Sequence, residues 1–256
     1  MMIGVILSAG MGTRLMPLTK DIPKPLLEIN GMTLLERMMR NCIAAGITDF
    51  ILIVGYNKEK VYDIAPELEE KLGVSIRIIE NVEYDVTNTS VSTYLASSYI
   101  EKENPDDFIL INGDNVVDPE IITRIAETGN TSMIVDNFKD LNEESFKLIL
   151  EDVRFNEDST IANGIIREIG KGIDIPSSTG EFIGVSKVVK SDIARFNEIL
   201  AALIDEDTQN YYDLAYKPLS NDATIDYVLT NGLKWTEIDD HNDWKTANGL
   251  IEEFQK

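Results

Sequence analysis

A glycine-rich segment near the N-terminus contains the residue types that bind a chain of phosphates. Gly10 and Gly12 directly follow an apolar run, Ile3–Ser8, and glycine lets backbone N–H groups approach phosphate oxygens without a Cβ in the way. Arg14 adds a forked cation, and Lys24, held between two prolines, adds a point charge. Since open α/β sheets bind ligands at the carboxyl ends of their strands, the segment predicts a cradle for a triphosphate.

The spacing of the glycines excludes two other phosphate-binding loops. A Walker A loop needs Gly-x-x-x-x-Gly-Lys-Ser/Thr, which this segment lacks. The dinucleotide fingerprint needs a third glycine three residues after Gly12, where Leu15 stands, and this excludes an NAD-dependent dehydrogenase. The loop residues predicted to bind the nucleotide, together with the later lysine, are Leu7, Ala9, Gly10, Met11, Gly12, Thr13, Arg14 and Lys24.

Three carboxylates predict a magnesium site, and one of them, Asp114, is also predicted to contact the nucleotide. Asp114 follows an apolar strand and Gly113, and a carboxylate there can hold Mg²⁺, a hard cation that needs oxygen ligands and bridges phosphates. Glu237 and Asp239 are two residues apart, so on a strand both project from one face. If they face Asp114 they complete the site, because the ion neutralises like-charged carboxylates.

Alternating strand and helix signals over about the first 140 residues favour a parallel sheet with helices on both faces, an α/β fold, of which residues 1 to about 130 are assigned to nucleotide binding. The expected strands are Ile3–Ser8, Phe50–Val54, Val74–Glu80 and Phe108–Asn112. The expected helices are Thr33–Ala45, Lys58–Leu72 with a break near Pro66, about Asn88–Glu101, and Pro119–Glu127. This part is the predicted nucleotide-binding half.

The pattern changes after Thr131 to longer strands and hairpins. The expected strands are Ser132–Phe138, Phe146–Glu151, Ile161–Ile169, Phe182–Val189 and Lys234–Asp239. The expected helices are Ser191–Leu203, capped by Ser191, and about Asn242–Phe254, started by Asp240. No repeat or low-complexity linker is present, so residues 1–256 are predicted to form one domain with an acceptor half from about residue 131 onward.

Composition limits the classes of partner. With 43% apolar and 27% charged residues the chain reads as an ordinary globular protein, and its formal charge of −22 argues against nucleic acid as a partner. No apolar run is long enough to span a bilayer, and the N-terminus lacks the features of a signal peptide. The single cysteine, Cys42, suits a reducing compartment and a place in the core, so the expected location is the cytoplasm. His241, the single histidine, is expected to be structural.

Residues 2–29 resemble the signature of the nucleoside-triphosphate transferase family that makes NDP-sugars and CDP-alcohols. The similarity of layout covers essentially the whole chain. The stretch Asn81–Leu95 is more similar to the phosphocholine cytidylyltransferase branch than to the glucose-1-phosphate enzymes, which typically carry a Gly-Leu/Thr-Ala segment before this helix. The resemblance implies a Rossmann-like, GT-A-like sheet, mostly parallel, with a mixed or antiparallel extension on the acceptor side.

The same resemblance implies roles for further residues. It places Lys171 against the acceptor phosphate and Glu181 on the acceptor side, where sugar-using members hold sugar hydroxyls. Asn88, Thr89 and Ser90 open a helix, where capping explains at least one of them, and the resemblance places this junction against the nucleotide base. The aromatic residues expected to contribute to a cage for a cationic acceptor are Tyr94 and Tyr212, with Tyr84, Tyr211 and Trp235 as further candidates.

The expected reaction is attack of an acceptor phosphate or phosphonate oxygen on the α-phosphate of CTP, with release of pyrophosphate. An ionised phosphate is already a nucleophile, so the protein must position two anions and offset their repulsion. Arg14 and Lys24 are the expected catalytic cations on the triphosphate and Lys171 the one on the acceptor. The preferred acceptor is a small phospho- or phosphono-alcohol, such as phosphocholine or an aminoalkylphosphonate.

Two alternatives stay open at this point. One is a sugar-1-phosphate nucleotidyltransferase that uses UTP or dTTP. The other is a regulatory subunit that binds a nucleotide without catalysis, against which the joint presence of the cations and carboxylates argues. The sequence leaves the acceptor and the oligomeric state, including a homodimer, undetermined.

Overall fold

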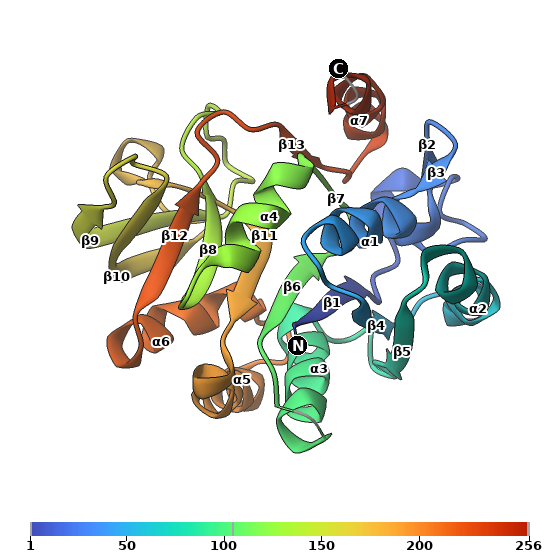
Figure 1. The fold of residues 1–256 in the computed structure, drawn as a ribbon, viewed down its shortest axis with the longest axis horizontal. Helices are drawn as coiled ribbons and strands as arrows, with labels where there is room; N and C mark the ends of the chain where they lie inside the picture. The colour runs from blue at the N-terminus through green and yellow to red at the C-terminus, as the bar shows by residue number, and fades with distance from the viewer. Residues whose placement is uncertain (1, 104, 255–256) are drawn as a thin grey trace.

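A nine-stranded mixed sheet forms the centre of the computed structural model, which describes residues 2–103 and 105–254 (Figure 1). In spatial order its strands are β5 (Ser75–Glu80), β4 (Asp49–Val54), β1 (Ile3–Ser8), β6 (Phe108–Asn112), β11 (Gly180–Val188), β8 (Thr131–Asp136), β12 (Ile225–Leu229), β10 (Ile161–Gly170) and β9 (Lys147–Phe155). Two short ribbons accompany it: β2 (Glu28–Ile29) with β3 (Met32–Thr33), and β7 (Asn115–Val117) with β13 (Trp235–Glu237).

The strands β5, β4, β1 and β6 run parallel, as expected for the nucleotide half. Leu7 of β1 is level with Asn112 of β6, and Ser8 is level with Val54 of β4. The segments that follow β1 and β6 therefore leave the sheet at the same edge. Val5 has no exposed surface, in agreement with a strand that is covered on both faces.

Helices cover both faces of the sheet. The core on one face contains side chains of α1 (Leu34–Ala44), α2 (Lys58–Leu72) and α4 (Pro119–Glu127). The core on the other face contains side chains of α3 (Thr89–Glu103), α5 (Ile193–Glu206) and α6 (Tyr216–Asp222). The last helix, α7 (His241–Phe254), packs beside β2 over a third, smaller core (Figure 1). Short 3-10 helices lie at Thr13–Leu15, Lys24–Leu26, Ile175–Ser177, Lys190–Asp192 and Tyr212–Ala215.

The second part of the sheet is mixed, which confirms the α/β fold with an acceptor-side extension. Strand β11 is antiparallel to β6 and to β8, whereas β12 is parallel to β8 and antiparallel to β10. Neither β12 nor α6 was expected from the sequence. β12 is only five residues long, too short for a period to be recognised, and its position inside the sheet depends on its neighbours.

The expected break near Pro66 is wrong, because α2 continues through that residue. Proline removes one helical hydrogen bond, and the residue four before it, Tyr62, is exposed, so water can bind the carbonyl group left free. Val61, Ala65 and Leu68 are buried on the same helix and hold it against the sheet. Buried apolar contacts therefore outweigh the lost bond.

Ser191 does not cap a helix as expected. It lies in a 3-10 turn, its hydroxyl donates to Asp192, and α5 begins only at Ile193 without a side-chain cap. The expected strand Lys234–Asp239 is also shorter, since β13 ends at Glu237 and lies outside the main sheet. None of the helices in the described ranges is long and apolar enough to cross a membrane.

Candidate active site

A cavity of about 890 Å³ lies where β1 and β6 end, and both halves of the chain line it. Its size is within the range of sites that hold small molecules. The sequence-predicted residues that line it are Leu7, Ala9, Gly10, Gly12, Arg14, Lys24, Asn88, Thr89, Asp114, Lys171, Glu181, Glu237 and Asp239, together with the further aromatic candidates Tyr84, Tyr211 and Trp235. Those that do not line it are Met11, Thr13, Ser90, Tyr94 and Tyr212.

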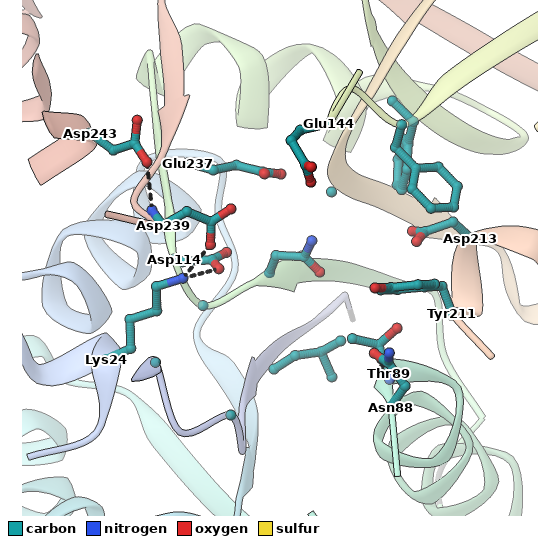
Figure 2. A pocket seen from close by; sticks show the side chains of 18 of the residues that line it. Lys24, Asn88, Thr89, Asp114, Glu144, Tyr211, Asp213, Glu237, Asp239 and Asp243 are labelled. Atoms are coloured by element: carbon teal, nitrogen blue, oxygen red, sulfur yellow. Dashed lines mark hydrogen bonds and ion pairs between the residues drawn. The ribbon is translucent and has the colours of Figure 1, made fainter. Parts of the chain in front are cut away.

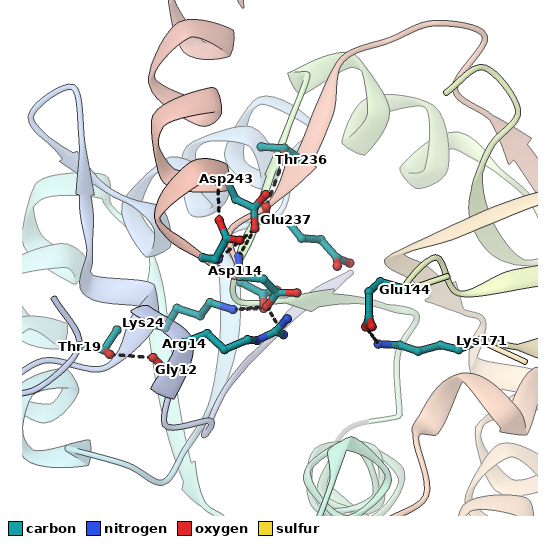
Figure 3. Close-up of polar contacts among 12 residues, drawn as sticks. Gly12, Arg14, Thr19, Lys24, Asp114, Glu144, Lys171, Thr236, Glu237 and Asp243 are labelled. Atoms are coloured by element: carbon teal, nitrogen blue, oxygen red, sulfur yellow. Dashed lines mark hydrogen bonds and ion pairs between the residues drawn. The ribbon is translucent and has the colours of Figure 1, made fainter. Parts of the chain in front are cut away.

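The glycine-rich loop forms one wall of this cavity. Gly12 has a φ of 59°, and a Cβ there would lie 3.1 Å from Cγ2 of Thr19, so the position requires glycine. Its carbonyl oxygen accepts a hydrogen bond of 2.8 Å from the Thr19 hydroxyl (Figure 3). A Cβ on Gly10 would meet nothing within 4 Å. The loop is thus fixed at Gly12 and leaves space at Gly10.

A second glycine brings β6 and β1 close enough to place Asp114. The Gly113 N–H donates to the Leu7 carbonyl at 2.9 Å, and a Cβ on Gly113 would lie 2.3 Å from that same oxygen. Any larger residue would push the chain away from β1. Asp114 therefore starts beside the glycine-rich loop, although the two are about a hundred residues apart in the sequence.

Lys24 joins two of the predicted metal-binding carboxylates. Its Nζ donates to Oδ2 of Asp114 at 2.7 Å and to Oδ1 of Asp239 at 2.9 Å (Figure 2), and Arg14 also contacts Asp239 at 2.9 Å. Burial by itself would lower the pKa of Lys24, but the charges and hydrogen bonds of Asp114 and Asp239 raise it overall. Lys24 is therefore a fully charged cation at the centre of the site.

Glu237 completes the group from the other strand of the short ribbon. It pairs in register with Asn115, and the N–H of Ile238 donates to the Asp114 carbonyl at 3.1 Å. Burial, followed by the negative charges of Asp114 and Asp239, holds the pKa of Glu237 well above its usual range. Asp239 reaches the same cavity from just beyond the end of β13, so both late carboxylates face Asp114 even though only Glu237 is on a strand.

The chemistry of this group suits a hard divalent cation. Asp114, Glu237 and Asp239 offer only oxygen ligands, and the pKa of Glu237 is raised first by its burial and then by the negative charges of Asp114 and Asp239. Within residues 2–103 and 105–254, however, no three acidic, cysteine or histidine side chains are already grouped to hold a metal. Lys24 lies among the carboxylates instead. The residues fit Mg²⁺ by their chemistry.

Asn88 and Thr89 line the cavity on the side opposite Lys24, close to Tyr211 (Figure 2). The Asn88 side-chain oxygen accepts from the Thr89 N–H at 2.8 Å. Ser90 has no exposed surface, because it points into the protein from the first turn of α3. Only the first two residues of the expected base-binding group therefore face the cavity.

Lys171 and Glu144 contact each other on the side of the cavity that is predicted to bind the acceptor. Lys171 Nζ lies 2.9 Å from Oε2 of Glu144 (Figure 3). Burial lowers the pKa of Lys171, whereas the hydrogen bond and charge of Glu144 raise it overall. Burial also raises the pKa of Glu181, which lines the same side. An acceptor phosphate can bind Lys171 if it displaces Glu144, an exposed partner.

The structure corrects the expectation that Tyr94 and Tyr212 contact the acceptor. Tyr94 packs against the core beneath α3, and Tyr212 has no exposed surface, its hydroxyl donating to Asn112 at 3.4 Å. The neighbouring Tyr211 lines the cavity, with its ring 5.7 Å from that of Phe146 in an edge-to-face arrangement. Adjacent residues in a 3-10 turn point in different directions, and packing chooses which one enters the core.

The family match decides what kind of protein this cavity belongs to. Residues 3–158 match the model of the family described as nucleotidyl transferase, which is more than half of the chain. This protein belongs to the nucleotidyl transferase family. The matched range contains the glycine-rich loop, Lys24 and Asp114, so the match extends over this wall of the cavity and over the Lys24–Asp114 ion pair.

Named relatives of this nucleotidyl transferase differ in nucleotide and acceptor. It is 38% identical over 115 residues to a mannose-1-phosphate guanyltransferase of Kluyveromyces lactis, across 45% of this chain and 31% of that protein. It is 37% identical over 98 residues to a 2-aminoethylphosphonate cytidylyltransferase of Lancefieldella rimae, across 38% of each protein. The chain thus matches well under two thirds of the length of either relative.

Solved structures of nucleotidyltransferases share the whole fold. The CTP:phosphocholine cytidylyltransferase from Streptococcus pneumoniae superposes with a TM-score of 0.75 at 24% identity, covering 98% of this chain and 99% of that one. The inositol-1-phosphate CTP transferase from T. maritima superposes with a TM-score of 0.78 at 22% identity, covering 99% of this chain and 96% of that one. At these identities the likeness establishes the fold of this family member, which confirms the GT-A-like expectation.

Several lining residues of this nucleotidyl transferase were missed by sequence reasoning, notably Lys139, Glu144 and Asp213. Lys139 lies 3.8 Å from the centre of the Trp235 ring and donates to the Trp235 carbonyl. Burial lowers the pKa of Lys139, although the charges of Asp136 and Glu181 oppose this. The sequence contained one indication of Lys139 and Glu144: residues 137–146 form a polar connection after β8, and such loops often contain functional residues.

Proposed function

We propose that this chain transfers CMP from CTP to a small phosphorylated or phosphonate alcohol of the phosphocholine or aminoalkylphosphonate class, and releases pyrophosphate. The observation that carries the proposal is one cavity with two separate cationic ends. Arg14 and Lys24 form one end together with Asp114 and Asp239, and Lys171 lies on the acceptor side. Two anions can therefore be held within the same cavity, as the transfer requires.

The residues of the chain supply binding and charge. Backbone groups from Gly10 to Gly12, with Arg14 and Lys24, hold the triphosphate, and Lys171 holds the acceptor phosphate or phosphonate. An acceptor oxygen forms a new bond to the α-phosphorus, and the bond from that phosphorus to the bridging oxygen of the β-phosphate breaks. Pyrophosphate takes the electron pair of the broken bond, and because the attacking acceptor oxygen is already ionised, the step needs no general base.

Asp114, with Glu237 and Asp239, is the proposed site of Mg²⁺. When bound there, the ion would offset the negative charge of the reacting phosphates, as divalent cations do in phosphoryl transfer. In its absence Lys24 balances Asp114 and Asp239. Omission of Mg²⁺ or addition of EDTA is expected to abolish turnover, and renewed Mg²⁺ is expected to restore it.

The choice of CTP rests on the stretch Asn81–Leu95 and on one named relative, the 2-aminoethylphosphonate cytidylyltransferase. Asn88 and Thr89 line the cavity and can read a pyrimidine edge with short polar groups. A sugar-1-phosphate nucleotidyltransferase is the second candidate, since a mannose-1-phosphate guanyltransferase is also similar and Glu181 lines the acceptor side. The buried thiol of Cys42 suits the proposed cytoplasmic location.

A pyrophosphate-release screen tests the proposal. CTP, UTP, dTTP, GTP and ATP are each combined with aminoethylphosphonate, phosphoethanolamine, phosphocholine, inositol phosphate or a hexose-1-phosphate, with Mg²⁺ present. We expect release only with CTP and a small phospho- or phosphono-alcohol. Turnover only with a hexose-1-phosphate would favour the sugar-using alternative, and no turnover with any pair would favour the nucleotide-binding subunit.

A further inference from the structure

Asp213 is a buried acid in the wall of the cavity, and one oxygen of its carboxyl group lacks a hydrogen-bond partner among the described residues. It is 6% exposed, lines the cavity, and its Oδ1 has no hydrogen-bond partner among the described residues. It lies in the 3-10 helix Tyr212–Ala215. Figure 2 shows its carboxylate pointing inward near Tyr211, on the side of the cavity opposite Lys24.

A buried acceptor atom without a hydrogen-bond partner, such as Oδ1 of Asp213, lowers the stability of the folded protein. A buried polar group without a partner loses its hydration and receives no bond in exchange. Burial raises the pKa of Asp213 to about 7, and the smaller lowering effects of its own backbone, of Tyr212 and of the charge of Lys171 do not offset it. Lys171 is itself paired with Glu144. Among the described residues, therefore, no cation forms an ion pair with Asp213.

The surroundings of Asp213 suit a small organic cation. Tyr211, two residues away, and Phe146 both line the cavity and contact each other edge to face, and aromatic faces attract cations. Lys171 lines the same cavity and is the proposed ligand of the acceptor phosphate. An acceptor that binds Lys171 through its anion can therefore extend its other end toward Asp213.

We infer that Asp213 binds a primary ammonium group of the acceptor and selects such acceptors over those with a quaternary ammonium or an uncharged end. The inference rests on the proposed function and narrows its substrate class to aminoalkyl phosphates and phosphonates. An N–H of a primary ammonium donates to Oδ1 and supplies the missing partner. A trimethylammonium group has the charge but no N–H, so it would leave that oxygen without a bond.

The test compares acceptors that differ in one end only. Wild-type protein and Asp213→Asn are assayed with CTP and aminoethylphosphonate, phosphoethanolamine, phosphocholine or ethylphosphonate, which has no amine. We expect the variant to lose about 10- to 100-fold in kcat/KM for the two primary amines, as when a charged hydrogen bond is removed. Its kcat/KM for ethylphosphonate and its KM for CTP are expected to change less than about threefold.

Asp226→Asn is the matched control, because Asp226 is also buried but does not line the cavity. We expect it to keep the wild-type preference among acceptors. Equal losses for aminoethylphosphonate and ethylphosphonate in Asp213→Asn would overturn the inference, as would a wild-type preference for phosphocholine or an Asp213-dependent affinity for a hexose-1-phosphate.

Calorimetric binding of the acceptors in the absence of turnover separates this inference from the proposed function. Aminoethylphosphonate that binds wild-type protein at least tenfold more tightly than it binds Asp213→Asn supports the role of Asp213 even if no CTP-dependent turnover is found. Turnover of phosphorylated acceptors with no difference between primary amine and uncharged end supports the function and overturns the role of Asp213.

Discussion

At the scale of single residues, Lys24 joins two carboxylates of the site through ion pairs. It contacts Asp114 and Asp239, which come from parts of the chain far apart in sequence, and only 13% of its side chain is exposed. In the proposed reaction the same ammonium group contacts the triphosphate. Its positive charge therefore pairs with Asp114 and Asp239 before the nucleotide binds and attracts the phosphates afterwards.

Lys24→Ala is expected to reduce kcat/KM for CTP by at least about 100-fold, because a preorganised charge near the reacting phosphates is lost. The fold should persist, since the substitution removes no apolar core contact. Steady-state kinetics and circular dichroism measure the two effects. Lys20→Ala is the control, as Lys20 is exposed and lies outside the cavity lining. Near-normal turnover of Lys24→Ala would contradict its catalytic role.

Asp213 makes the stability of the protein depend on pH. The folded-state pKa of about 7 lies above the ordinary value of 3.8, so ionisation opposes folding. This cost is absent below pH 4, grows as the pH rises toward 7, and is complete above it. Relative to wild type, Asp213→Asn should therefore gain about 2–3 kcal/mol in free energy of unfolding between pH 5 and pH 8. Urea denaturation at both pH values measures it, and an equal difference at both would contradict the raised pKa.

At the scale of elements, the ribbon of β7 and β13 and helix α7 place the late carboxylates. Glu237 is level with Asn115 in the ribbon, next to Asp114. The Asp243 carboxylate accepts from the N–H groups of Asp239 and Asp240 at 3.0 and 2.9 Å, and thereby fixes the turn into α7. The position of Asp239 therefore depends on how α7 packs.

Ile251→Ala tests this dependence. Ile251 has no exposed surface and belongs to the small core beneath α7, so its truncation should cost about 2–4 kcal/mol in free energy of unfolding. Since α7 begins just after Asp239, kcat/KM should fall as well, by a few-fold. Glu252→Ala, at an exposed position on the same helix, should change neither. A destabilised variant with unchanged kcat/KM would show that α7 does not position Asp239.

At the scale of the whole molecule, the excess of 45 acidic over 23 basic side chains dominates. A net charge of −22 destabilises the compact state through self-repulsion, and it also repels an anionic nucleotide. Within the cavity, Arg14, Lys24 and Lys171 oppose this field locally.

Added salt is therefore expected to stabilise the protein. Raising the NaCl concentration from about 0.05 to about 0.5 M shortens the screening length and weakens repulsion between distant carboxylates, so Tm should rise by about 2–4 °C. Differential scanning fluorimetry at fixed pH measures the change. A fall in Tm would mean that surface ion pairs such as Lys58–Glu80 outweigh the general repulsion.

Local sequence signals determined much of the fold and the triphosphate end of the site. Buried strands such as β1 and β6 were predictable because each is a continuous apolar run, and the bounds of α4 agree with the expected helix. The glycine-rich loop and Lys24 were identifiable because backbone geometry and charge act within a few residues. Asp114 was placed correctly in the cavity because it comes just after the end of an apolar strand, β6.

Only the tertiary structure decided which side chains face the acceptor. Tyr211 and Tyr212 are neighbours in sequence, yet packing turns the second into the core and leaves the first in the cavity. No periodic pattern in the sequence predicts that an oxygen of Asp213 lacks a hydrogen-bond partner or that Glu144 contacts Lys171. Both features arise where separate segments of the chain meet. The sequence by itself thus determined a phosphate-binding α/β fold, while long-range packing determined the shape and charge of the acceptor end.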